Sequence, residues 1–283
     1  MQASSFPPFL LVALLLSIGL TCRLNAEEKA KPEEAPPKAP FDTSQAQSSR
    51  LPLPSPYDKM LAIEMAAKGK KIQWGKVYDA VAIDVDANSC PDKTSAALAL
   101  GVKIADGLVA VKSQDVEKLN SCATQIESIA KKLGAGDEEL KRARLVREGA
   151  NKGKWLDVFL ELGFLQADIM KILNRQENAN DRKLIIASGW MQGARHITYY
   201  LIEHYDAEIS NVLREPLLVG ELSKEIKELP AQTLAHPRVK ALPQAFEQAL
   251  PLVSVGKDQA VSKENVAKLK TIADAATKSA LDQ

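Results

Sequence analysis

The sequence has few cysteines and few aromatic residues, and it carries no excess of charge of either sign. Its three cysteines are too few for a disulfide-dense miniprotein or for a four-cysteine zinc site. The formal net charge of +1 excludes a protein that binds nucleic acid through bulk positive charge, and also an acidic disordered tail. What is present, 283 residues of which 46% are hydrophobic and 26% charged, is typical of a globular protein that can bury a core.

Short catalytic and cofactor-binding motifs are also missing. There is no Gly-x-Ser-x-Gly nucleophile turn, no phosphate-binding loop, no Gly-x-Gly-x-x-Gly and no His-Glu-x-x-His. The spacing of Asp84, Asp86 and Asn88 is typical of a calcium loop, but Ser95 stands where that loop requires a glutamate. The sequence therefore predicts no catalytic residue, no metal site and no cofactor from its motifs.

Residues 1–26 have the pattern of a secretory signal peptide. Residues 6–21 form an uncharged apolar run, which is short for a membrane-spanning helix but has the length of a signal-peptide core. Residues 24–26 (Leu-Asn-Ala) then offer a cleavage site, so we predict cleavage after Ala26 and export to the periplasm or the extracellular space. An uncleaved anchor and a lipid anchor at Cys22 are disfavoured alternatives. Cleavage removes Arg23, which leaves 36 basic and 36 acidic residues and no predicted membrane span.

Residues 27–56 differ from the rest of the chain because they are rich in proline and polar residues. Prolines stand at positions 32, 36, 37, 40, 52, 54 and 56, and apolar periodicity is almost absent. Ordering such a segment would cost backbone entropy with little burial in return. We therefore predict a disordered, semi-extended linker at 27–56, followed by a single domain at 57–283.

The domain at 57–283 is predicted to be all-α. Apolar residues recur every three to four positions in almost every segment, and short connections predict a bundle of about seven to nine helices. The predicted helices are 94–111, which is apolar on nearly all sides, 116–133 with Ser113 as its N-cap, 138–148, 154–173, 181–205, 218–229 and 262–281. Two regions depart from this pattern: residues 77–85 are predicted to form a short extended piece, and Pro237, Pro243 and Pro251 to break their region into short turns.

Two short motifs resemble segments of a group of exported, all-helical bacterial proteins. Residues 101–107 (Gly-Val-Lys-Ile-Ala-Asp-Gly), followed by Asp115, are similar to a helical hairpin in that group. Residues 189–193 (Gly-Trp-Met-Gln-Gly) are similar to its Gly-Trp-x-x-Gly segment. The resemblance spans residues 96–198. It implies export and a helical fold, and it implies no activity because the group has none assigned.

Asp106 is the charged residue of greatest interest in the predicted core. A carboxylate inside a central helix is unfavourable unless it is paired or hydrogen-bonded. The favoured interpretation is a salt bridge with Lys103, three residues earlier, at a polar edge of the bundle. The alternative pairs Asp106 with Arg195 in a ligand pocket.

Gly189 and Gly193 lie four residues apart on a predicted helix, where each glycine costs about 1 kcal/mol relative to alanine. The favoured explanation is close approach of a second helix, with Trp190 beside it in the core, and the alternative is a ligand on the glycine face. The candidate binding residues are therefore Asp106, Gly189, Trp190, Gly193 and Arg195. On the same helix His196, Tyr199, Tyr200 and Glu203 are predicted to lie on the side opposite the apolar face. His196 and Glu203 lie about 10 Å apart along the axis, which is too far for one metal ion.

Cys90 and Cys122 remain after the predicted cleavage, and two cysteines in an oxidising compartment favour a disulfide. Geometry opposes it. If the chain turns near Ser113, the two residues lie about 20 Å apart along the hairpin, far beyond the Cα separation of about 7 Å that a disulfide allows. We predict two free, largely buried thiols. A Cys90–Cys122 disulfide is the disfavoured alternative and requires the helix to begin late, near Thr94.

These observations favour a non-catalytic protein of the cell envelope that binds a protein partner or a small ligand, and no nucleic acid. The alternative is an enzyme whose site is assembled from the dispersed residues Asp106, Arg195 and His196. A closed apolar bundle would favour the binding protein, whereas polar groups that converge in a cleft would favour the enzyme.

Overall fold

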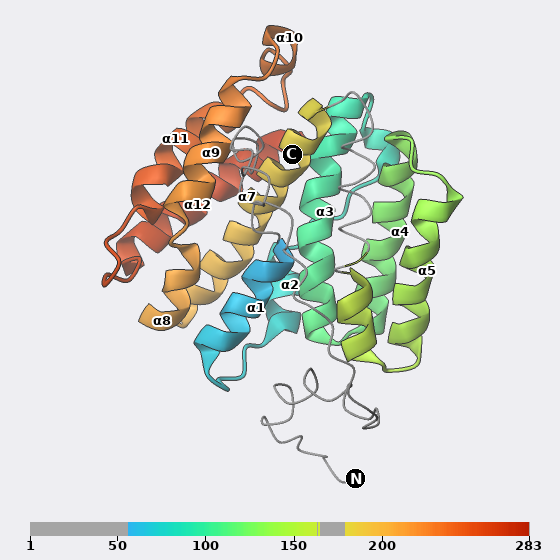
Figure 1. The fold of residues 1–283 in the computed structure, drawn as a ribbon, viewed down its shortest axis with the longest axis horizontal. Helices are drawn as coiled ribbons and strands as arrows, with labels where there is room; N and C mark the ends of the chain where they lie inside the picture. Colours follow the sequence, from blue (N-terminus) through green and yellow to red (C-terminus); the bar gives the residue numbers. More distant parts are fainter. Residues whose placement is uncertain (1–55, 163, 165–178, 283) are drawn as a thin grey trace, which may run out of the picture. The chain divides into compact units, whose positions relative to one another are not determined.

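The structure, a computed structural model, describes residues 56–162, 164 and 179–282, all within the compact unit Pro52–Gln283. The predicted all-α bundle is confirmed, because the described residues contain helices, turns and loops without a β-strand (Figure 1). The helices are α1 (Pro56–Ala67), α2 (Trp74–Val81), α3 (Lys93–Ser113), α4 (Val116–Lys132), α5 (Asp137–Asn151), α7 (Ala179–Glu203), α8 (Ala207–Ser210), α9 (Pro216–Lys227), α10 (Ala231–Leu234), α11 (Leu242–Val253) and α12 (Lys263–Leu281), with 3-10 turns η2 (Ala87–Ser89) and η3 (Asn211–Leu213). Residues 155–162 are also helical. The predicted signal peptide lies outside the described residues, as does the predicted linker except for Pro56, which begins α1.

The helices α3 and α7 form the centre of the bundle. Helix α3 packs against α7 on one side and against α4 on the other, and α5 lies beyond α4 (Figure 1). Helix α7 also packs against α12, which contacts α11, and α11 in turn contacts α9. Within the described residues α3 alone is long and apolar enough to cross a membrane, and 89% of its most apolar stretch is buried inside the bundle. It is therefore a core helix, as its apolar sequence predicts.

The two central helices cross with their backbones in contact at Gly101 of α3 and Gly189 of α7. A Cβ atom on Gly101 would lie 2.2 Å from the carbonyl oxygen of Ile185 and 2.9 Å from the backbone nitrogen of Gly189. A Cβ atom on Gly189 would lie 3.1 Å from the carbonyl oxygen of Gly101. The structure thus has the close helix approach that is the favoured explanation of Gly189.

Polar side chains cap the N-termini of three of the long helices. Asp92, Asp115 and Ser262 accept hydrogen bonds from backbone N–H groups in the first turns of α3, α4 and α12. The prediction that Ser113 caps α4 was wrong, because Ser113 is the last residue of α3. Gln114 follows it with a φ of 54°, and this left-handed residue ends α3 one position before the true cap.

Three other predicted boundaries were wrong. Residues 77–81 belong to α2, and extended backbone begins only at Ala82. Pro243 and Pro251 lie inside α11 and do not break it. Pro243 is in the first turn, where a proline removes an N–H that has no helical partner. Pro251 comes only in the last turn, where the helix ends two residues later. Helix α5 continues through Gly149 to Asn151. Of the predicted helix 154–173, residues 155–162 and 164 are helical, and residue 163 and residues 165–173 lie outside the described residues.

Cys90 and Cys122, the two cysteines among the described residues, are buried and unbonded. The carbonyl oxygen of Cys90 accepts a hydrogen bond from Lys132 Nζ at 3.0 Å, at the end of α4. Cys122 lies ten residues earlier on the same helix, about 15 Å along its axis, with its Sγ 3.2 Å from the hydroxyl of Tyr78. The two thiols therefore lie at different levels of the bundle.

We expect Cys90 and Cys122 to contribute two reactive thiols per chain when the protein is unfolded without a reducing agent. The reason is that Cys90 contacts the side chain of Lys132 at the end of α4, whereas Cys122 lies ten residues earlier on that helix, which places the two thiols beyond the reach of a disulfide. Thiol titration of a chain cleaved after Ala26 checks this directly, since it lacks Cys22. A count of zero would contradict the arrangement of α3 and α4 described above.

Candidate functional site

A polar network lies inside the bundle where α2, α3 and α7 meet. Lys103 and Asp106 are both fully buried, and Lys103 Nζ donates hydrogen bonds to Asp106 Oδ2 at 3.0 Å and to the carbonyl oxygen of Ile83 at 2.8 Å. Asp106 also accepts from the backbone N–H of Ile83 at 3.2 Å and from Gln192 Nε2 at 2.6 Å. The predicted Lys103–Asp106 salt bridge is present, but its predicted position at a polar edge was wrong.

The surroundings of this pair favour its charged form. Burial by itself would raise the pKa of Asp106, but His196, Lys103 and Gln192 together hold that pKa below its ordinary value. Burial would likewise lower the pKa of Lys103, whereas the Asp106 carboxylate raises it above its ordinary value. His196 Nε2 lies 3.1 Å from Asp106 Oδ1 but outside hydrogen-bonding geometry. The result is a buried ion pair with an imidazole beside it.

Arg195 extends the network to α12. Its Nε donates to Asp274 Oδ1 at 2.7 Å, and its Nη1 donates to Gln192 Oε1 at 2.7 Å and to the carbonyl oxygen of Val81 at 3.3 Å. Arg195 is therefore linked to Asp106 through Gln192, which differs from the predicted alternative of a direct pair. The carbonyl of Val81 and both backbone groups of Ile83, where the chain leaves α2, find their partners in this network.

The network has the properties of a structural element that holds the α2–α3 connection against α3 and α7. Asp106, Arg195 and His196 are 0%, 8% and 2% exposed, so a substrate in solvent has no access to the first and last of them. Their polar atoms are directed at the backbone of the α2–α3 connection and at one another. A buried backbone group without a partner is costly, and side chains that supply those partners stabilise the connection.

The other predicted binding residues do not join one pocket. Gly189 is covered by α3. Trp190 lies in the core, with its ring centroid 5.7 Å from that of Phe246, and its Nε1 donates to Glu215 Oε2 at 2.9 Å. Gly193 is half-buried, and a Cβ atom there would meet nothing within 4 Å. The favoured explanation of a close helix approach therefore applies to Gly189 and not to Gly193.

We expect Gly193→Ala to raise the free energy of unfolding by about 0.5–1 kcal/mol. The new methyl group enters open space, and alanine loses less backbone entropy than glycine when a helix forms. Denaturant unfolding measures the change, with Gly189→Ala as the matched control that should destabilise, because its Cβ would lie 3.1 Å from a carbonyl oxygen. Destabilisation by Gly193→Ala would show that something occupies this side of α7.

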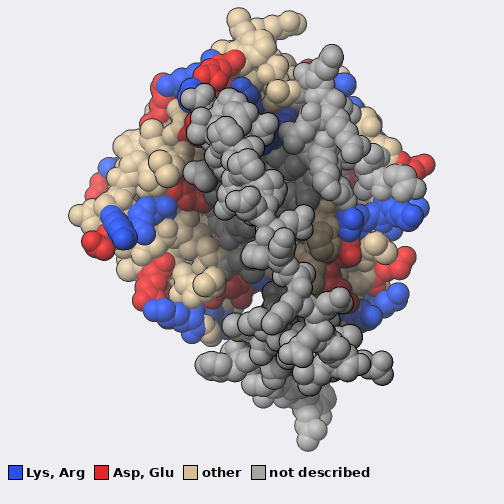
Figure 2. Space-filling view, in the orientation of Figure 1, with Lys and Arg blue, Asp and Glu red and all other residues tan. Residues whose placement is uncertain are grey.

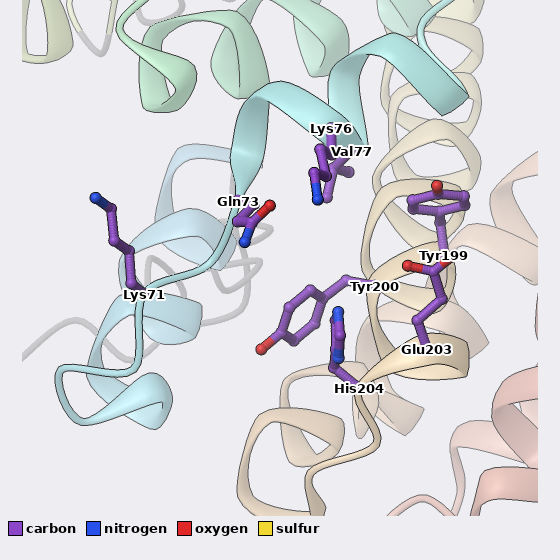
Figure 3. A pocket seen from close by; sticks show the side chains of 8 residues that line it. All are labelled: Lys71, Gln73, Lys76, Val77, Tyr199, Tyr200, Glu203 and His204. Carbon is purple, nitrogen blue, oxygen red and sulfur yellow. The ribbon is translucent and has the colours of Figure 1, made fainter.

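A pocket of about 250 Å³ lies at the surface between the start of α2 and the last turns of α7 (Figure 3). It is lined by Lys71, Gln73, Lys76 and Val77 on the α2 side and by Tyr199, Tyr200, Glu203 and His204 on the α7 side. Figure 3 shows Gln73 and Lys76 across the space from Tyr200, and the carboxylate of Glu203 next to the ring of Tyr199. The rings of Tyr200 and His204 lie 5.4 Å apart, so the α7 wall is largely aromatic.

The pocket contains charges of both signs that the described residues leave without an ion pair. Lys71 and Lys76 are on one wall and Glu203 is on the other, and none of the three has a salt-bridge partner within the described part of the chain. Elsewhere on the visible face, basic and acidic side chains are intermixed (Figure 2). Unpaired charges that line a concave site are available to a ligand.

Two ion pairs fix the chain that leads into the pocket. Lys68 and Glu208 pair at 2.8 Å, and Lys70 pairs with Asp206, the N-cap of α8. The hydrogen bond and charge of Asp206 raise the pKa of Lys70 above its ordinary value. Residues 68–70 are thereby held against the segment that follows α7, so both walls of the pocket are anchored to the same part of the fold.

The sequence did not predict this pocket, although it indicated the polar character of one of its walls. It placed Tyr199, Tyr200 and Glu203 on the polar side of the 181–205 helix, where they lie, together with His196, which is in fact buried. The available signal for the second wall was the density of lysine, with four of the nine residues between 68 and 76. Periodicity could not show that two of these lysines would be paired and two would face the pocket.

The fold and this site define an all-helical bundle with a small, charged and partly aromatic pocket on its surface. Among the described residues, no cluster of three or more His, Cys, Asp or Glu side chains is placed to hold a metal ion. Comparisons of the chain with protein-family models, curated proteins and solved structures found no match.

Proposed function

We propose that this chain is an exported, non-catalytic binding protein that takes up a small molecule between α2 and α7. The observation that carries the proposal is the pocket of about 250 Å³ with unpaired lysines on one wall and an aromatic, acidic second wall. Pockets for drug-sized ligands have volumes of about 300–1,000 Å³, so this one suits a smaller metabolite. A small concave site favours a small molecule over a protein partner.

The buried network supports binding over catalysis. An enzyme built from Asp106, Arg195 and His196 requires these groups to reach a substrate. Asp106 and His196 are closed off from solvent, and Arg195 is engaged by Asp274 and Gln192. The accessible polar groups of the described pocket belong to other residues, and they are suited to recognising charge and aromatic surface.

Thermal unfolding of the purified protein with a panel of small zwitterions, anions and cations tests the proposal. A ligand that binds only the folded state, present at about 100 times its Kd, stabilises that state by about 2.7 kcal/mol. We expect at least one class of probe to raise the unfolding temperature of the wild type, and Gln73→Trp to abolish this effect because the indole fills the pocket. If no probe acts, or if Gln73→Trp responds equally, the site is not a binding site.

Export rests on residues 1–26 and is tested separately. We expect the mature protein recovered from its native host to begin at Glu27, because residues 24–26 form the predicted cleavage site. N-terminal sequencing measures this. An intact Met1 would identify an uncleaved segment, and a lipid-modified Cys22 would identify an anchored protein.

A further inference from the structure

We infer that the α2–α7 pocket recognises a zwitterionic molecule of amino-acid size, with its carboxylate towards Lys76 and its amino group towards Glu203. This inference rests on the proposed function, because it names the ligand class of the same site. It follows from the size of the pocket, from the placement of its charges and from its aromatic wall.

The volume limits the ligand to a small molecule. A space of about 250 Å³ lies just below the range of about 300–1,000 Å³ that is typical of pockets for drug-sized ligands. A free amino acid is smaller than such ligands and suits a space of this order. The pocket is partly open, so a longer substituent on the ligand would extend into solvent past Lys71 at the rim (Figure 3).

The opposite charges of Lys76 and Glu203 favour a ligand that carries both a positive and a negative group. Lys76 and Glu203 face the same space from opposite walls, and within the described residues neither has an ion-pair partner. A ligand with only a carboxylate would satisfy Lys76 and be repelled by Glu203, and a ligand with only an amine would meet the reverse. A zwitterion satisfies both charges at once, which is the electrostatic complementarity that gives specificity.

Other lysines near Lys76 are paired, whereas Lys76 and Lys71 are left for a ligand. Lys68 and Lys70 pair with Glu208 of α8 and with its N-cap Asp206, and Lys118 of α4 pairs with Asp79 at 2.9 Å. Lys76 thus remains the α2 cation that faces the pocket. Because the ion pairs of Lys68 and Lys70 hold the wall in place before a ligand arrives, less ordering is required on binding.

The aromatic wall provides the remaining recognition. Tyr200 lies across from Lys76, and its ring is 5.4 Å from that of His204. A tyrosine face attracts a nearby ammonium group and also packs against apolar carbon. An amino group held at Glu203 would therefore also lie close to tyrosine rings, and the carbon skeleton of the ligand would pack on Tyr200.

Matched sets of ligands test the inference by isothermal titration on the purified protein. One set is L-phenylalanine, 3-phenylpropionate, which lacks the amino group, and 2-phenylethylamine, which lacks the carboxylate; analogous sets with smaller side chains accompany it. We expect the zwitterion of at least one set to bind about tenfold more tightly than both partners in its set. Equal or tighter binding by the carboxylate or the amine overturns the inference and leaves the proposed function in place. No binding by any set overturns the inference alone if another probe binds in the thermal panel, and overturns both proposals if none does.

Charge variants give a readout that a loss of folding would not produce. Glu203→Gln should weaken binding of the zwitterion by about tenfold while it strengthens binding of the matched carboxylate, because it removes an attraction for one and a repulsion for the other. Lys76→Gln should weaken binding of both by a similar factor. Lys240→Gln and Glu117→Gln, exposed residues outside the pocket, are the controls and should change neither. If Glu203→Gln weakens both ligands equally, the inference is wrong.

Discussion

Asp106→Asn is expected to lower the free energy of unfolding by about 3–5 kcal/mol. The substitution leaves the ammonium of Lys103 fully buried without a counter-ion, and the hydrogen bond from Gln192 loses its charged acceptor. Denaturant unfolding followed by circular dichroism measures the loss. The matched control is Asp79→Asn, which breaks an exposed pair with Lys118 and should cost about 1 kcal/mol or less. Equal effects of the two substitutions would show that the Lys103–Asp106 pair is hydrated.

Replacing both Lys103 and Asp106 by apolar residues should recover only part of the free energy of unfolding that Asp106→Asn loses. Buried ion pairs can often be exchanged for apolar residues at little cost, but here the pair also binds the backbone N–H and carbonyl of Ile83. In the double variant Lys103→Met, Asp106→Leu these groups lose their partners, at about 1–3 kcal/mol each. Full recovery of stability would mean that the α2–α3 connection finds other partners.

The same carboxylate contributes to the acid stability of the protein. Because its folded pKa is held below the ordinary value, its contribution is fully present above about pH 4 and is lost as the pH falls through the lowered pKa. We therefore expect the unfolding free energy of Asp106→Asn to fall less steeply below pH 4 than that of the wild type. Unfolding curves measured across this range test the sign. A steeper fall in the variant would contradict the direction of the shift.

Gly101→Ala is expected to destabilise the protein by about 3 kcal/mol or more, at the upper end of the overpacking range. The added methyl carbon would lie 2.2 Å from the carbonyl oxygen of Ile185 and 2.9 Å from the backbone nitrogen of Gly189. Backbone atoms of a central helix cannot rotate away as a side chain can, so α3 and α7 must separate. Thermal or denaturant unfolding measures the loss.

Gly107→Ala, on the same helix, is the matched control for this prediction. Its Cβ atom would meet only Ile126 Cδ1, at 3.4 Å, and alanine has the higher helix propensity by about 1 kcal/mol. We expect a neutral or stabilising effect. Similar losses at positions 101 and 107 would show that glycine itself, and not the crossing with α7, is what α3 requires.

Most of the fold could be predicted from the sequence because helical periodicity is a local signal. The apolar run of α3 and the alanine-rich α12 both lie close to where the sequence places them. The wrong predictions of helix boundaries concern residue types whose effect depends on their position in the helix. A proline ends a helix when it lies in the middle, but Pro243 lies in a first turn, and a serine and an aspartate two residues apart compete to cap α4.

The candidate site was less predictable because its contacts join distant segments. Lys103 and Asp106 are three residues apart, so their pair follows from helix geometry. The link from Val81 to Gln192 and Arg195 spans more than 100 residues, and no periodicity encodes it. The same holds for the pocket, whose walls at Lys76 and Glu203 come from helices that are separated in the chain by α3, α4 and α5.

The polar network also has a consequence for the order of events during synthesis. Its members are added to the growing chain at residues 81–83, 103–106, 192–196 and finally 274, and the last bond joins residues 79 positions apart. Until α7 and α12 have been synthesised, the charges of Lys103 and Asp106 are better solvated by water than by the incomplete chain. The Lys103–Asp106 pair therefore cannot gain its observed partners on α7 until residues 192–196 have been added, and Arg195 gains its partner on α12 only with residue 274.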